Sequence, residues 1–223
     1  MRILIAGAGR AGLSVAGYLT SAGHQVTVID RDPVVCARVK DQLGIVALAG
    51  DAADSAILTE AEVHHAEVVV AMLRRDADNL AVASLAKVAH VQRVMVRMRD
   101  PDYRPVYLAA GVDRILSETE IFIGSLAASI EHEAVLHAML LGSGESVAFE
   151  IAIPETSRVI GRSIGEIAAM PGFPKSCVFA GIYAPDGTIE GPRGATVIVG
   201  GMTVLLVALR NEVKQTLALL IEK

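Results

Sequence analysis

Three glycines near the start of the chain have a spacing that can bind a phosphate group. Residues 7–12 are Gly7, Ala8, Gly9, Arg10, Ala11 and Gly12. They follow a short apolar run and open a helical pattern, which is the context of a phosphate-binding turn, although an ordinary tight turn is the alternative. The first glycine permits the bend, the second leaves room for a pyrophosphate, and the third lets the helix pack against the strand. Unpaired N–H groups and the helix dipole would then attract the anion.

A carboxylate follows the next predicted strand, where it can bind a ribose. Asp30 ends the run Val28-Ile29-Asp30, and an acid in this position accepts hydrogen bonds from ribose hydroxyls. Because NAD(H), ATP, ADP and AMP share the adenosine half, the pattern does not choose between them. The charge of Asp30 disfavours the 2′-phosphate of NADP, although Arg31 could reduce the repulsion.

Arg10, Asp51 and Ala52 complete the residues expected at this site. Arg10 lies inside the glycine turn, where a guanidinium can bind phosphate oxygens in a fork. Its alternative role is that of a solvated side chain at a helix start. Asp51 and Ala52 follow the third predicted strand and would lie beside the adenosine pocket. For Asp51, capping of a helix is an equally good explanation.

The elements that must position these residues alternate between strands and helices. Apolar runs predict strands at residues 3–6, 26–29, 45–48, 68–71, 94–96 and 114–116. With helical patterns between them, this alternation is typical of an α/β domain, a Rossmann-like doubly wound parallel sheet, which we assign to residues 1–138. A long helical pattern at 120–141 could contact another protomer or pack on its own core.

A second, smaller α+β domain is predicted for residues 145–223. Gly142, Ser143 and Gly144 interrupt the helical pattern, and no comparable alternation resumes after them. Strands are predicted at residues 147–153, 178–183, 188–190 and 203–209. A helix is predicted at 164–170, and a turn at 184–187 would join two of the strands.

Composition excludes several classes of protein. The chain has 223 residues, of which 52% are hydrophobic, and a formal net charge of −5. Its lysines and arginines are scattered along the sequence. Both the negative charge and this scatter disfavour nucleic-acid binding. Cys36 and Cys177 are isolated and suggest neither a zinc site nor a disulfide framework. The N-terminus lacks the features of a signal peptide, and the longest uncharged run, residues 194–209, falls short of the roughly 20 residues that span a bilayer. We therefore expect a cytoplasmic protein.

Several strings of residues, in this order, resemble the RCK domain, the regulator of potassium conductance. Besides residues 7–12 and 28–30, they are Gly50-Asp51-Ala52, residues 94–97 and residues 111–118. Residues 163–167 and 191–196 are similar to the C-terminal domain that accompanies it in Trk/Ktr-type potassium uptake systems. The resemblance covers nearly the whole chain.

The resemblance implies a regulatory subunit, not an enzyme, that gates potassium transport. Such a subunit would bind NAD(H) or ATP/ADP and form a homo-oligomer, a dimer that builds to a tetramer or octamer ring. The ring would lie at the inner face of the cell membrane, beneath an integral-membrane potassium-translocating subunit. Ligand binding by the second domain stays open, because Gly200-Gly201 stand where the family commonly has Gly-Asp.

The resemblance also implies roles for individual residues. The nucleotide would be bound by Gly7, Gly9, Arg10, Gly12, Asp30 and Asp51. Arg97 would approach the phosphates, in one arrangement from a neighbouring subunit; the alternative is a solvated arginine at a strand end. Glu118 matches an acid near a divalent cation between subunits, where oxygen ligands would suit Mg²⁺ or Ca²⁺, although Ser117 replaces the usual proline before it.

Two other functions stay open. An NAD-dependent dehydrogenase or reductase would use the same glycines and Asp30. Against it, no tyrosine has the lysine partner that short-chain dehydrogenases require, and the second domain shows no clear acid–base pair. A nucleotide sensor that regulates a different transporter would contain the same motifs.

Overall fold

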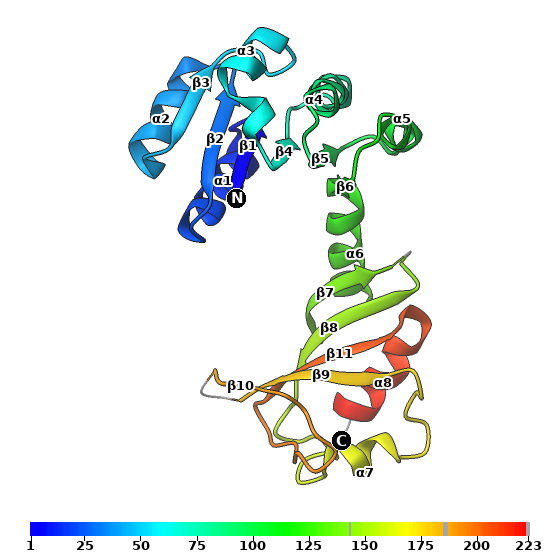
Figure 1. Cartoon of the computed structure of the whole chain (residues 1–223). Coiled ribbons are helices and arrows are strands. Elements are labelled where there is room, and N and C mark those ends of the chain that lie inside the picture. Colours follow the sequence, from blue (N-terminus) through cyan, green and yellow to red (C-terminus); the bar gives the residue numbers. More distant parts are fainter. Residues whose placement is uncertain (143, 185–186, 222–223) are drawn as a thin grey trace. The chain divides into compact units, whose positions relative to one another are not determined.

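Short runs rich in valine and isoleucine form a six-stranded parallel sheet in the first of two units. The structure is a computed structural model that describes residues 1–142, 144–184 and 187–221, and it divides into the units Met1–Glu118 and Thr119–Lys223. The strands of the first unit are β1 (Arg2–Ala6), β2 (Gln25–Asp30), β3 (Val46–Ala49), β4 (Val68–Ala71), β5 (Arg93–Met98) and β6 (Arg114–Ser117) (Figure 1). Their order, β3-β2-β1-β4-β5-β6, confirms the predicted Rossmann-like fold.

Helices connect these strands, and local sequence signals set several of their ends. They are α1 (Arg10–Ser21), α2 (Pro33–Leu43), α3 (Ser55–Glu60), α4 (Asp76–Val88) and α5 (Arg104–Ala109), with short 3₁₀ turns η1 (Val63–His65) and η2 (Pro101–Tyr103). Asp32 caps α2 by accepting a hydrogen bond from the N–H of Val34, and Gly44 ends that helix in the left-handed conformation. Asp54 caps α3 in the same way.

Both faces of the parallel sheet are buried. Ile3 and Ile5 of β1 belong to one core cluster, which also contains Val39 of α2. Leu4 and Ala6 point to the opposite face, into the cluster that is built largely by α4 and its neighbours. The alternation follows from the two-residue period of a strand. Helices on both faces leave only the ends of the strands for a site, and the strand order reverses between β1 and β4, which is where ligands bind in such sheets.

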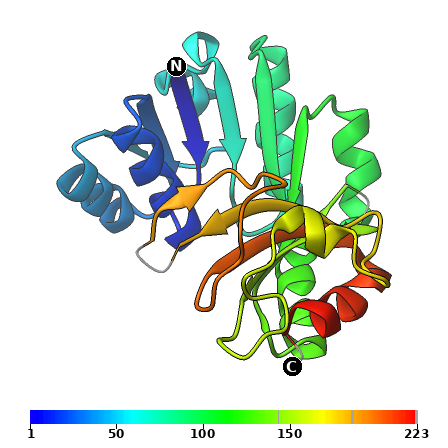
Figure 2. The ribbon, with the colours of Figure 1, turned by 90° about the horizontal axis from the view of Figure 1, so that it is seen from below.

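The second unit contains an antiparallel sheet that packs against helices. Its elements are α6 (Glu118–Glu131, which begins at the last residue of the first unit), β7 (Val135–Leu141), β8 (Ser146–Ala152), α7 (Ile164–Ala168), β9 (Val178–Tyr183), β10 (Ile189–Glu190), β11 (Thr203–Leu209), η3 (Arg210–Glu212) and α8 (Val213–Ile221). The strand order is β10-β9-β11-β8-β7. Phe149, Ile151 and Leu206 form one core with Leu217 and Leu220 of α8, and Figure 2 shows this helix, in red, against the sheet.

The predicted long helix at residues 120–141 is wrong in its second half. Helix α6 ends at Glu131, and residues 135–141 form β7, which pairs antiparallel with β8. An apolar run such as this fits a helix or a buried strand equally well by its periodicity, and pairing with β8 decides between them. Gly142 and Gly144 have φ angles of 60° and 94° and connect the two strands; Ser143 lies outside the described residues.

This strand also places the division of the chain earlier than the sequence suggested. The predicted boundary, between residues 138 and 145, falls inside the second unit, because β7 belongs to its sheet. The predicted strands and the helix after residue 145 are present, with ends that differ by about two residues. Helix α8 was not predicted; the polar residues Arg210, Asn211 and Glu212 of η3 separate it from β11. Of the predicted turn at 184–187, Pro185 and Asp186 lie outside the described residues.

Candidate functional site

A cleft lies where the first unit exposes the carboxyl ends of its central strands. Its volume is about 890 Å³, within the range of ligand sites. The side chains and backbone that line it come from Gly7, Gly9, Arg10, Ala11, Gly12, Asp30, Arg31, Asp32, Val35, Met72, Leu73, Arg74, Arg75, Asp78, Arg97, Arg99 and Glu118. Eight of these residues are among those predicted to bind the nucleotide, and Glu118, predicted to lie near a divalent cation, lines the cleft as well.

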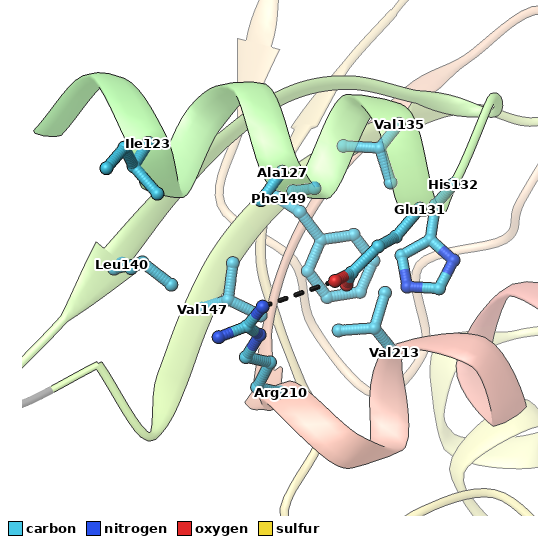
Figure 3. A pocket seen from close by; sticks show the side chains of 11 residues that line it. Ile123, Ala127, Glu131, His132, Val135, Leu140, Val147, Phe149, Arg210 and Val213 are labelled. Carbon is cyan, nitrogen blue, oxygen red and sulfur yellow. Dashed lines mark hydrogen bonds and ion pairs between the residues drawn. The ribbon is translucent and has the colours of Figure 1, made fainter. Parts of the chain in front are cut away.

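A second hollow, in the other unit, is too small for a nucleotide. It lies between α6, β7, β8 and the start of α8, and Figure 3 shows apolar side chains such as Phe149 and Val213 around it. Its volume is about 40 Å³, close to the space that one water molecule occupies. Arg210 and Glu131 form an ion pair of 3.2 Å beside it (Figure 3). The cleft of the first unit is therefore the stronger candidate.

Each glycine of the turn at residues 7–12 has a distinct structural role. Gly7 has a φ angle of 103°, and a Cβ atom there would lie 2.9 Å from the carbonyl oxygen of Met72. A Cβ atom on Gly12 would overlap the carbonyl oxygen of Gly7. A Cβ atom on Gly9, in contrast, would meet no atom within 4 Å. Gly7 and Gly12 are therefore required by the fold, whereas Gly9 leaves open space in the cleft.

The start of α1 is left without a capping side chain. The N-cap residue is Gly9, which has no side chain to accept a hydrogen bond, and the first turn of the helix contains no acidic residue. Helices α2 and α3 differ, because Asp32 and Asp54 each accept a hydrogen bond of 2.9 Å from their first turns. The first N–H groups of a helix lack intrahelical partners. Together with the open space at Gly9, these groups fit a bound phosphate.

Asp30 joins the glycine turn to the start of α2. Its Oδ2 atom accepts a hydrogen bond of 2.7 Å from the N–H of Ala8, and its Oδ1 atom accepts one of 3.0 Å from the N–H of Asp32. Ala8 itself is buried and does not line the cleft. Its N–H therefore orients the carboxylate. Each carboxylate oxygen can accept a further hydrogen bond, which leaves capacity for a ribose hydroxyl.

Replacing Asp30 should weaken nucleotide binding and should also reduce stability, because the N–H groups of Ala8 and Asp32 lose their acceptor. We expect Asp30→Ala to reduce the affinity for ADP by about 1–3 kcal/mol, the range for hydrogen bonds to a charged group. Isothermal titration calorimetry measures the effect. Asp54→Ala is the matched control, because it removes a similar backbone-bonded aspartate outside the cleft and should change only stability, by about 1 kcal/mol. Equal affinities in the wild type and Asp30→Ala would remove Asp30 from the site.

Asp51 and Ala52 are not among the residues that line the cleft. The Oδ2 atom of Asp51 lies 2.7 Å from Nη2 of Arg31, and its Oδ1 atom accepts a hydrogen bond of 3.0 Å from the N–H of Ala53. The hydrogen bond from Arg31, followed by that from the N–H of Ala53, lowers the pKa of Asp51. The hydrogen bond to Asp51 and the negative charge of that carboxylate raise the pKa of Arg31. Ala52 is buried in the core. Asp51 thus acts on the cleft through Arg31, which does line it.

Release of Arg31 should change the choice between NAD⁺ and NADP⁺. In Asp51→Asn the guanidinium loses its ionic partner and becomes available to a 2′-phosphate. We expect the affinity for NADP⁺ relative to NAD⁺ to rise about threefold, the scale of a surface ion pair. Competition of the two dinucleotides against a fluorescent ADP derivative measures the ratio. An unchanged ratio would show that Arg31 does not face the 2′ position.

Arg97 and Glu118 form an ion pair at the β5–β6 side of the cleft. Nη2 and Nε of Arg97 lie 2.7 and 2.9 Å from Oε2 of Glu118. Both residues line the cleft, and contact between Arg97 and the phosphates, which the resemblance implied, stays a prediction. Within residues 1–142, 144–184 and 187–221, no group of three or more His, Cys, Asp or Glu side chains is arranged to hold a metal ion. A divalent cation at Glu118 stays a prediction that requires ligands from a second subunit.

Arginines that the sequence did not assign to the site also line the cleft. Arg74 and Arg75 follow β4, and Arg99 follows β5. Arg75 lies 3.9 Å from Asp78, which is in the first turn of α4. Their positions after parallel strands were the available signal, because the carboxyl ends of such strands meet at one edge. With six arginines against four acidic residues, the cleft favours an anion.

Buried polar side chains hold the segments that carry these arginines. Asn79 accepts a hydrogen bond of 2.7 Å from the N–H of Leu73 and donates one of 3.0 Å to the carbonyl of Arg97. Asp76 is 7% exposed, and its carboxylate lies 2.9 Å from the hydroxyl of Tyr107. Burial, with the hydrogen bond to Asp76, raises the pKa of Tyr107, so its hydroxyl stays a donor. The ends of β4 and β5 are therefore tied together.

Comparisons with known proteins assign a separate family to each of the two units. The TrkA-N domain family matches residues 3–118, and the TrkA-C domain family matches residues 148–221. A Trk system potassium uptake protein TrkA homolog of Methanothermobacter thermautotrophicus is 27% identical over 215 residues, which cover 96% of this chain and 97% of that protein. A protein of the same name from Archaeoglobus fulgidus is 31% identical over 218 residues, 96% of this chain and 48% of that protein. This chain thus spans about half of the second relative.

Solved structures show the same fold. The structure described as the GsuK channel bound to NAD has a TM-score of 0.67 and 19% sequence identity, over 99% of this chain and 39% of that chain. At this identity the likeness shows the fold alone. The match of the TrkA-N family to more than half of the chain confirms the resemblance that the sequence motifs suggested. The chain belongs to the TrkA-N domain family, and a TrkA-C domain follows in its second unit.

Proposed function

We propose that this chain is a nucleotide-binding regulatory subunit that gates a potassium uptake system or channel. The observation that carries the proposal is the uncapped start of α1, where Gly9 opens onto a cleft that also contains Asp30 and six arginines. Backbone N–H groups would bind the phosphates, and Asp30 would bind the ribose. NAD(H), ATP and ADP all fit this description.

The names of related proteins support the transport role. Relatives that match 96% of the chain are called potassium uptake proteins, and a channel with the same fold has been solved with NAD. We propose that this chain, too, binds a nucleotide and acts in potassium transport, because the cleft suits the ligand that these names imply. The membrane partner would be an integral-membrane potassium-translocating subunit, and this chain would lie at its cytoplasmic face.

Coupling to a pore requires that the nucleotide distinguish two conformations. A ligand shifts a conformational equilibrium only by the difference between its affinities for the two states. We propose a homo-oligomeric ring, a dimer that builds to a tetramer or octamer, whose conformation changes with the nucleotide and is transmitted to the pore. A divalent cation, Mg²⁺ or Ca²⁺, at Glu118 between subunits would then stabilise one arrangement of the ring.

Reconstitution tests the gating role. The chain is expressed with the potassium-translocating subunit from the same genome, purified from membranes, and placed in proteoliposomes loaded with a potassium-sensitive dye. We expect the two proteins to co-purify, and we expect the rate of potassium flux to differ between ATP, ADP and NAD(H). Absence of association, or flux that is identical with and without every nucleotide, would contradict the proposal.

The glycine turn and Asp30 would also serve an NAD-dependent dehydrogenase, and an assay separates the two functions. Purified protein is incubated with NAD⁺ or NADH and a panel of small alcohols and carbonyl compounds. We expect nucleotide binding without turnover, as suits a regulatory protein. Hydride transfer at a rate above that of free cofactor would favour the enzyme. Co-purification with a transporter for another ion would instead favour a sensor for that transporter.

A further inference from the structure

The strand order separates the two ends of a nucleotide in the cleft. Asp30 follows β2, the glycine turn follows β1, and Arg74 and Arg97 lie at the ends of β4 and β5. Because β1 lies between β2 and β4 in the sheet, a ribose at Asp30 and a diphosphate at the turn direct the rest of the phosphate chain toward β4 and β5. The arginines at that end are therefore placed for terminal phosphates.

One buried carboxylate ties together the two segments that carry these arginines. Asp76 is the first residue of α4, directly after Arg74 and Arg75. It accepts hydrogen bonds from the N–H of Arg99, at 3.1 and 3.3 Å from its two oxygens, and from the N–H of Asp100, at 3.1 Å. In addition, Nη1 of Arg99 donates a hydrogen bond of 3.2 Å to the carbonyl of Arg74. The loop after β4 and the loop after β5 are thus held as one surface.

The hydroxyl of Tyr107 completes the environment of this carboxylate. It lies 2.9 Å from Oδ1 of Asp76 and 3.0 Å from the carbonyl oxygen of the same residue. Tyr107 is fully buried, and Asp76 is not among the residues that line the cleft. Asp76 can therefore influence a ligand only through the segments that it holds.

We propose that Asp76 is a positioning residue that aligns Arg74, Arg75 and Arg99 with the terminal phosphates of a bound nucleotide, so that affinity rises with the number of phosphates. The inference rests on the proposed nucleotide binding and adds the ligand preference to it. Arginines bind phosphate through paired N–H donors in a fixed geometry, so their contribution depends on alignment. AMP, which ends at the glycine turn, would gain little from them.

Asp76→Asn tests the alignment. The amide group replaces one acceptor oxygen with a donor, which faces either an N–H group or the Tyr107 hydroxyl and releases the segment after β5. Calorimetric titration of the purified full chain with AMP, ADP and ATP gives three dissociation constants. We expect the affinity for ATP to fall about tenfold, as for the loss of a charged hydrogen bond, with little change for AMP. The ratio of the AMP dissociation constant to the ATP dissociation constant should therefore shrink.

Asp113→Asn is the matched control. The Asp113 carboxylate also ties α4 to β5, because it accepts a hydrogen bond of 2.7 Å from the N–H of Val94 and one of 2.6 Å from Nζ of Lys87. None of these three residues lines the cleft. We expect this variant to lose thermal stability. Its ratio of the AMP dissociation constant to the ATP dissociation constant should equal that of the wild type.

The possible outcomes separate this inference from the proposed function. If Asp76→Asn and Asp113→Asn weaken AMP and ATP by the same factor, Asp76 is structural only and the inference is overturned. If the wild type binds none of the three nucleotides, the proposed function fails as well. If Asp76→Asn does not fold, Tyr107→Phe is the second test, because it removes a hydrogen bond to Asp76. It should reduce the ratio of the AMP to the ATP dissociation constant to a smaller extent. An unchanged ratio in Tyr107→Phe would overturn the inference.

Discussion

Gly12→Ala is expected to destabilise the first unit and to abolish nucleotide binding. The added methyl group would overlap the carbonyl oxygen of Gly7 and would lie 3.0 Å from its carbonyl carbon. Because both groups belong to the backbone, no side-chain rotation relieves the overlap, and the strand and helix must separate. We expect a loss of about 3 kcal/mol, the upper part of the range for overpacking. Urea unfolding monitored by circular dichroism measures it.

Gly17→Ala in the same helix is the control for this substitution. A Cβ atom on Gly17 would make an ordinary contact of 3.4 Å with Cδ2 of Leu43. Alanine is also the better helix former, by about 1 kcal/mol. Gly17→Ala should therefore be as stable as the wild type or more so, with normal binding. If Gly12→Ala behaved like Gly17→Ala, the close contact between α1 and the end of β1 would be refuted.

Gly9→Val is expected to abolish nucleotide binding while the fold stays intact. Gly9 has φ and ψ angles of −57° and −179°, which a valine can adopt. Nothing lies within 4 Å of the position of a Cβ atom, so the first carbon of the side chain meets no neighbouring group in the free protein. It would occupy the space of the phosphate, however, and cover the N–H groups at the start of α1. We expect an affinity loss of at least about a hundredfold, or 2.7 kcal/mol.

Thermal shift measurements with ATP and NAD⁺ detect the expected loss of affinity in Gly9→Val. The wild type should be stabilised by both nucleotides, as mass action requires of a ligand that binds the folded state. Without ligand, Gly9→Val should have the same melting temperature as the wild type. Adding ATP or NAD⁺ should not raise the melting temperature of this variant. Gly9→Ala, with a smaller side chain, should lie between the two. Wild-type stabilisation of Gly9→Val would show that the phosphates bind elsewhere.

Most of the first unit could be predicted because local patterns and tertiary contacts agree in it. Each strand is an apolar run bounded by turn or capping residues, and Asp32 with Pro33 marks the start of a helix unambiguously. The glycine turn and Asp30 are also separated by a single helix, so their meeting follows from the βαβ unit itself. In the second unit, the strand β7 could not be distinguished from a helix until its partner β8 was known.

The rest of the site depends on contacts between residues that are distant in the sequence. Nothing near Asp76 indicates that its carboxylate binds the backbone after β5 or the hydroxyl of Tyr107. Likewise, the direction in which Arg31 points is set by Asp51, at the end of a different strand. The sequence identifies these side chains as charged and near strand ends. Which of them face the ligand and which face one another is decided by packing.

Calorimetric titration of the wild-type chain with ATP, ADP, NAD⁺ and NADH tests the central claim most directly. Oligomer mass is recorded on the same samples by light scattering. We expect saturable binding of adenosine nucleotides at one site per chain, with mutual competition, since all would share the cleft between Gly9 and Asp30. If no adenosine-bearing compound binds at any concentration up to the millimolar range, the cleft is not a nucleotide site and the proposed gating function loses its input.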